Sequence, residues 1–112
     1  MLQVFDNLAR NSHYWLERAA RLIPDLQKKL TFEFENPLVF VWDNGLGIDD
    51  RIASRIFEVF VSGKPEGEGH GLGLYLTQEL LALEKSTIVL LPERNTHGRQ
   101  FKFEINLEGA LK

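Results

Sequence analysis

The first 23 residues carry a pattern that repeats every three or four positions, the period of one face of an α-helix. Because proline cannot continue a helix, we expect this helix to end before Pro24. The same period places a polar stripe beside the mainly apolar one, formed by Gln3, Asn7, Asn11, Tyr14 and Arg18. The mainly apolar stripe consists of Leu2, Phe5, Leu8, Ala9, Ser12, Trp15, Leu16, Ala19 and Ile23.

Two strand patterns follow. Residues 30–35 alternate apolar and polar side chains, which is typical of a half-buried strand. Residues 38–42 are apolar throughout, as in a strand that is covered on both faces. Asn36 and Pro37 separate the two runs and favour a turn, so we expect an antiparallel hairpin.

The second half of the chain predicts two helices and two strands. Ile48, Ile52, Ile56 and Phe60 are spaced by four behind a capping Asp49, which indicates a helix. Residues 61–70 are glycine-rich and charged and predict a mobile loop. A helix is expected over 72–84, then strands over 87–91 and 100–107 around a turn at 95–98.

The order of these elements predicts a single α+β domain over residues 1–112. We expect a two-layer sandwich, with helices on one face of an antiparallel or mixed sheet. The order lacks the regular strand–helix alternation of a doubly wound dinucleotide fold. With 112 residues the chain is long enough to bury one core.

Composition narrows the classes of partner. The net charge of −3 gives no general attraction to nucleic acid or to an anionic membrane. The absence of cysteine excludes disulfides and thiolate metal sites. No apolar run approaches the roughly 20 residues that span a bilayer, so we expect a cytoplasmic domain without membrane contact.

Two glycine clusters are candidate binding sites. Gly69, Gly71 and Gly73 lead into the third predicted helix, where exposed backbone N–H groups favour a phosphate chain. Asp43 follows a buried strand and precedes Gly45 and Gly47, so its carboxylate could accept a hydrogen bond from an exocyclic amine such as that of adenine. The alternatives are a flexible loop for the first cluster and a turn-forming Asp for the second.

Polar side chains elsewhere in the sequence could bind a metal ion or contact a phosphate group. Asn7 and Asn11 lie one helical turn apart, and an amide oxygen can help hold Mg²⁺. Lys64 could contact a terminal phosphate, although a lysine in a loop is usually only solvated. The three histidines lie on different predicted elements and form no metal-binding pattern.

Taken together, these motifs resemble the GHKL ATPases, which include sensor histidine kinases, DNA gyrase B subunits, MutL proteins and heat-shock chaperones of the ninety-kilodalton class. Residues 3–12 resemble the asparagine box of that family, 43–48 the first glycine box, 56–64 the phenylalanine box of histidine kinases and 69–74 the second glycine box. The four motifs occur in the family's order and cover nearly the whole chain.

The resemblance implies the Bergerat fold with bound ATP and Mg²⁺. Asn11 would bind the metal, Asp43 the adenine amine, and Lys64 would lie near the γ-phosphate. Asn7 and Lys64 are the implied catalytic residues. The implied nucleotide-binding residues are Asn11, Tyr14, Asp43, Gly45, Gly47, Ile48, Lys64, Gly69, His70, Gly71, Leu72 and Gly73.

Asn7 indicates the subfamily. Hydrolytic members of the family carry a glutamate there that activates water, and an amide cannot act as a general base. The resemblance therefore implies a histidine kinase domain that transfers phosphate to a histidine on another domain or chain, with a response regulator downstream. The alternatives are a non-catalytic ATP-dependent switch read by a partner, and an interaction domain that binds no nucleotide.

Three features differ from the family pattern. Tyr14 stands where many histidine kinases have lysine, and Gly98-Arg99 where Gly-Thr is common. The sequence begins at the asparagine box, so we expect the usual N-terminal strands and the phospho-acceptor domain to be missing. This would leave an exposed sheet edge that could support a dimer.

Overall fold

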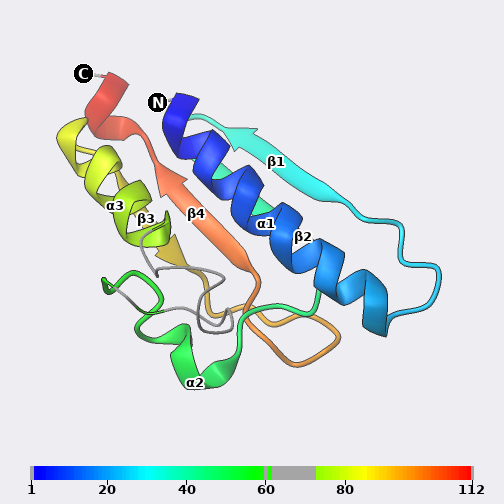
Figure 1. Ribbon diagram of the computed structural model, residues 1–112. Coiled ribbons are helices and arrows are strands. Elements are labelled where there is room, and N and C mark those ends of the chain that lie inside the picture. The colour runs from blue at the N-terminus through cyan, green and yellow to red at the C-terminus, as the bar shows by residue number, and fades with distance from the viewer. Residues whose placement is uncertain (1, 60, 62–72, 112) are drawn as a thin grey trace.

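The computed structural model describes residues 2–59, 61 and 73–111 (Figure 1). None of the helices in these ranges combines the length and hydrophobicity needed to cross a bilayer. The predicted order of helices and strands is confirmed, whereas residues 62–70 of the predicted mobile loop lie outside the described residues. The elements are α1 (Leu2–Leu22), β1 (Leu30–Glu35), β2 (Leu38–Asp43), α2 (Asp50–Ala53), α3 (Gly73–Leu83), β3 (Thr87–Leu90), β4 (Lys102–Asn106) and the 3₁₀ helix η1 (Glu108–Leu111).

The described strands form one four-stranded sheet in the order β1-β2-β4-β3. Each pairing between them is antiparallel, which resolves the choice that the sequence left open. β1 and β2 form the predicted hairpin around Asn36–Pro37, and β4 lies between β2 and β3. Figure 1 shows α1 and α3 side by side on one face of the sheet, as a two-layer α+β sandwich requires.

The core lies between these two helices and the inner face of the sheet. Val39 pairs with Ile105 and Val41 with Phe103, so side chains from β2 and β4 form one apolar surface. The helices cover this surface with aliphatic side chains. The fully packed cluster is Val4, Leu8, Val39, Val41, Leu81, Ile88, Phe103 and Ile105.

The predicted inner face of α1 was wrong at its start. Leu2 is 87% exposed, whereas Val4, which the pattern left out, is only 1% exposed. At about 100° per residue, a step of four residues makes one full turn plus about 40°, whereas a step of six residues makes one full turn plus about 240°. Val4 therefore shares the face of Leu8, and Leu2 does not.

The second predicted helix is much shorter than the spacing of its isoleucines suggested. Asp49 does cap α2, since its side chain accepts a hydrogen bond of 2.9 Å from the Arg51 N–H. After Ala53 the chain continues in tight turns, not in an α-helix. Ile56 is nevertheless buried. The apolar spacing therefore reflects burial of these side chains without a regular helix. Phe60, the last residue of that spacing, lies outside the described residues.

The corrected face of α1 predicts different costs for two leucines. Leu8→Ala should lower the free energy of unfolding by about 2–5 kcal/mol, because it opens a cavity in the core. Leu2→Ala removes the same atoms from an exposed position and should change it by less than about 0.5 kcal/mol. Urea unfolding followed by circular dichroism measures both. Equal costs would contradict the assigned face.

Candidate functional site

Asp43, the last residue of β2, connects the sheet to α1. The Gly45 N–H donates a 3.0 Å hydrogen bond to Asp43 Oδ1. The carboxylate also hydrogen-bonds the side chain of Ser12 on α1, which is only 7% exposed. Ser12 is the neighbour of Asn11, so the contact brings the asparagine motif and the first glycine motif together.

The electrostatics of Asp43 follow from its position at this junction. Burial raises the pKa of Asp43 above its ordinary value of 3.8, and the hydrogen bonds from Gly45 and Ser12 offset only part of that rise. A carboxylate offers about four lone-pair positions, more than two donors occupy. Asp43 can therefore accept a further hydrogen bond from a ligand.

The backbone at Gly45 lies directly against α1. A Cβ atom at this position would lie 3.0 Å from Asp43 Oδ1, 3.6 Å from Leu16 Cδ2 and 3.8 Å from Ala19 Cβ. The first of these contacts is tighter than side chains normally accept. Glycine at this position thus lets the turn reach the helix while Gly45 still donates to the carboxylate.

Gly47 meets a different part of the molecule. Its φ of +91° lies in the left-handed region, and a Cβ atom would lie 2.8 Å from both Arg99 Cβ and Asn95 Nδ2. The next residue, Ile48, donates its N–H to Gln100 O at 2.8 Å. The turn is therefore held between α1 and the 95–100 turn.

Asn95 is a residue that the sequence did not single out. Its side-chain Nδ2 donates to Leu46 O at 3.1 Å, while its Oδ1 accepts from the N–H groups of His97 and Arg99 at 2.9 and 3.1 Å. One amide thus shapes its own turn and ties it to the glycine turn. The only available signal was an Asn at the start of a predicted turn.

The polar stripe of α1 is partly buried: Gln3 is exposed and Arg18 is half-buried. Asn7, Asn11 and Tyr14 are all half-buried. The Tyr14 hydroxyl accepts a 3.2 Å hydrogen bond from Arg18, and its ring packs edge-on against Trp15 at a centroid distance of 5.0 Å. Tyr14 is therefore positioned at least in part by its own helix.

The second glycine motif is placed only at its end. Gly73 is exposed and begins α3, where its carbonyl accepts a 2.9 Å hydrogen bond from Thr77 Oγ1. Since α3 packs beside α1, this helix start belongs to the same layer as the asparagine motif. Five predicted site residues lie outside the described residues: Lys64, Gly69, His70, Gly71 and Leu72.

The donor groups on the described residues fit a nucleotide-bound Mg²⁺ better than a metal held by protein alone. Among the described residues, no group of three or more His, Cys, Asp or Glu side chains could hold a metal ion. Mg²⁺ in nucleotide sites takes most of its ligands from phosphate and water, and needs only one or two from the protein. The half-buried Asn11 amide can provide one such oxygen.

Comparison with known proteins identifies similar chains. Residues 1–109 match the family model described as histidine kinase-, DNA gyrase B-, and HSP90-like ATPase. The chain is 38% identical over 81 residues to the autoinducer 1 sensor kinase/phosphatase LuxN of Vibrio harveyi, covering 70% of this chain and 9% of that protein. It is 29% identical over 111 residues to cyanobacterial phytochrome A of Nostoc, covering 97% of this chain and 14% of that protein.

A solved structure supports the fold. The mycobacterial sensor histidine kinase MprB superposes with a TM-score of 0.62 at 18% identity, covering 92% of this chain and 66% of that one. At this identity the likeness shows the shared fold alone. The chain also spans only about a tenth of the length of the curated relatives that it matches. It covers 11% of the C4-dicarboxylate transport sensor protein DctS of Rhodobacter capsulatus.

The raised pKa of Asp43 predicts how stability depends on pH. Between the unfolded value near 3.8 and the higher folded value, the unfolded chain releases this proton first, so stability falls as pH rises through that window. Asp43→Asn keeps an oxygen for the Gly45 N–H but cannot ionise. Its free energy of unfolding should therefore rise relative to wild type between about pH 3 and pH 7.

Urea titrations at several pH values measure this difference. Asp25→Asn, the same change in an exposed turn, controls for the altered net charge. A difference between Asp43→Asn and wild type that stays constant with pH would contradict the assignment.

Proposed function

Because the chain belongs to the histidine kinase-, DNA gyrase B- and HSP90-like ATPase family, we propose that it is the ATP-binding domain of a sensor-histidine-kinase-like protein. In this proposal it binds Mg-ATP and positions the γ-phosphoryl group for transfer to a histidine on another domain or chain. The observation that carries the proposal is the half-buried Asp43 carboxylate, held beside a turn with glycine at positions 45 and 47 and against α1.

Adenine recognition would use the carboxylate and the turn together. Asp43 would accept a hydrogen bond from the exocyclic amine, and the backbone at Gly45 and Gly47 would lie beside the base. The turn is fixed by α1 on one side and by the 95–100 turn on the other. Such preorganisation favours binding because little ordering remains to be done when the ligand arrives.

The triphosphate would extend from the base toward the start of α3. Unpaired N–H groups at a helix N-terminus attract anions, and Gly73 begins this helix. Asn11 would supply an oxygen to Mg²⁺, which neutralises phosphate charge when it is bound. The residues from Gly69 to Leu72 would provide further backbone donors, and Lys64 a positive charge near the γ-phosphate.

Asn7 favours transfer to a protein acceptor over hydrolysis. An uncharged amide cannot remove a proton from water, so no strong base is supplied at this position. In the proposed transfer, an imidazole nitrogen of the acceptor forms a bond to the γ-phosphorus while the bond to the bridging oxygen breaks and ADP leaves. Relatives whose names include sensor kinase or histidine kinase support a histidine acceptor, and we propose a response regulator downstream of it.

Loss of the Asp43 carboxylate should weaken nucleotide binding without unfolding the domain. A hydrogen bond to a charged group is worth about 1.5–3 kcal/mol, so Asp43→Asn should weaken binding of a non-hydrolysable ATP analogue about 10–100-fold. Isothermal titration calorimetry measures the affinity, with Asp25→Asn as the matched carboxylate-to-amide control. Unchanged affinity in a folded Asp43→Asn variant would refute the assigned adenine contact.

The role proposed for Asn11 predicts a dependence on magnesium. Wild type should bind the analogue more tightly with Mg²⁺ than with excess chelator, and Asn11→Ala should lose most of that difference. Gln3→Ala removes an exposed amide from the first turn of the same helix and should retain it. An Asn11→Ala variant with the full magnesium effect would show that the metal is held elsewhere.

A further inference from the structure

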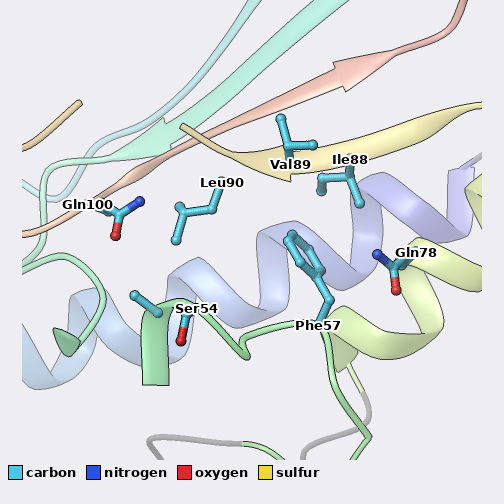
Figure 2. Close-up of a pocket in the computed structure, with 8 residues that line it drawn as sticks. Ser54, Phe57, Gln78, Ile88, Val89, Leu90 and Gln100 are labelled. Carbon is cyan, nitrogen blue, oxygen red and sulfur yellow. The ribbon is translucent and has the colours of Figure 1, made fainter. Parts of the chain in front are cut away.

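The 95–100 turn lies beside the candidate site, although none of its residues is among the nucleotide-binding residues that the sequence implied. The base of the turn is anchored to the sheet. Arg94 and Gln100 form a β-bridge, and Gln100 Nε2 donates to Leu91 O at 3.1 Å. Gln100 and Leu90 of β3 both line the pocket shown in Figure 2. The turn is therefore a fixed support that can hold a neighbouring segment in place.

The two ends of the Asn95 side-chain amide make different contacts. Its Oδ1 accepts from the N–H groups of His97 and Arg99, which lie in the same turn. Backbone hydrogen bonds also close that turn, since the Gly98 N–H donates to Asn95 O at 2.9 Å. The Nδ2 donor takes no part in the turn and reaches Leu46 O at 3.1 Å. One end of the amide shapes its own turn, and the other end holds the glycine turn.

Glycine at position 47 allows Asn95 to make this second contact. A Cβ atom on Gly47 would lie 2.8 Å from Asn95 Nδ2, so a larger residue would push the amide away from Leu46 O. The two residues are therefore matched to each other, although they lie far apart in the chain.

The contact fixes the direction of the peptide group between Leu46 and Gly47. In a trans peptide the C=O and N–H bonds point in opposite directions, so holding Leu46 O at Asn95 turns the Gly47 N–H away from the 95–100 turn. Within the described part of the chain, this N–H donates to no other group. The half-buried turn thus combines an unpaired backbone donor with the Asp43 carboxylate, which is an acceptor.

From this geometry we infer that Asn95 is a positioning residue for nucleotide binding, which aims the Gly47 N–H at a ring nitrogen of the base. The inference rests on the proposed function and extends it to base specificity. Adenine has an amine next to a ring nitrogen without hydrogen, so it offers a donor to Asp43 and an acceptor to Gly47. A 6-oxopurine has an oxygen next to a ring N–H, so both contacts would be mismatched.

Asn44 provides a matched control for Asn95. Its Oδ1 accepts from the Lys29 N–H at 2.8 Å, and its Nδ2 donates to Gln27 O at 2.7 Å. The Asn44 amide therefore ties the start of the same glycine turn to a different segment of the chain. Replacing it removes an equivalent tie without releasing Leu46 O.

Calorimetric titration with ADP and with 1-deaza-ADP, both in the presence of Mg²⁺, tests the inference. 1-Deaza-ADP has a C–H group in place of the ring nitrogen next to the amine. Wild type should bind ADP about five- to tenfold more tightly, as expected for one neutral hydrogen bond. Asn95→Asp keeps the oxygen that the turn needs but loses the donor, so most of this preference should disappear.

Two further variants complete the test. Asn95→Ser, whose hydroxyl is too short to reach Leu46 O, should also lose the preference for ADP, and it adds no charge. Asn44→Asp should retain the preference. Circular dichroism establishes that each variant is folded.

The outcomes distinguish this inference from the proposed function. If folded wild type binds no ADP, the proposed function fails and the inference fails with it. If wild type binds ADP but shows no preference over 1-deaza-ADP, or if both Asn95 variants keep that preference, only the inference is wrong. Loss of the preference in Asn44→Asp as well would also overturn it, because any loosening of the turn would then have the same effect.

Discussion

The hydrogen-bonded contact between Ser12, Asp43 and Gly45 is the constraint on which the candidate site depends. It joins α1 to the end of the central strand β2. Placing a carboxylate there carries an energetic cost, since burial disfavours its ionised form. Two donors reduce that cost without exhausting the acceptor capacity of the carboxylate, so Asp43 can still accept a further hydrogen bond.

The glycine turn is shaped from outside as much as by its own sequence. Gly45 permits contact with α1, whereas Gly47 permits the approach of the 95–100 turn. Asn95 and the carbonyl of Gln100 then hold the two segments together across about fifty intervening residues. A side chain at either glycine would therefore strain a tertiary contact as well as a local turn.

Because tertiary contacts shape the glycine turn, only part of the candidate site could be predicted from the sequence. The hairpin strands followed from one alternating and one continuous apolar run, and Asp43 from its place between that apolar run and two glycines. Ser12 and Asn95 could not be assigned, because a hydrogen bond between distant polar groups leaves no local pattern. The length of α2 was also out of reach, since burial of Ile56 in a tight turn gives the same spacing as a helix.

The core and the candidate site draw on the same two helices. On α1, Leu8 packs in the core while Asn11 and Ser12 belong to the candidate site one turn later. On α3, Leu81 packs in the core and Gly73 begins the helix. A change that rotates either helix would disturb both roles at once. Only substitutions that preserve the core can therefore separate a lost ligand contact from a displaced helix.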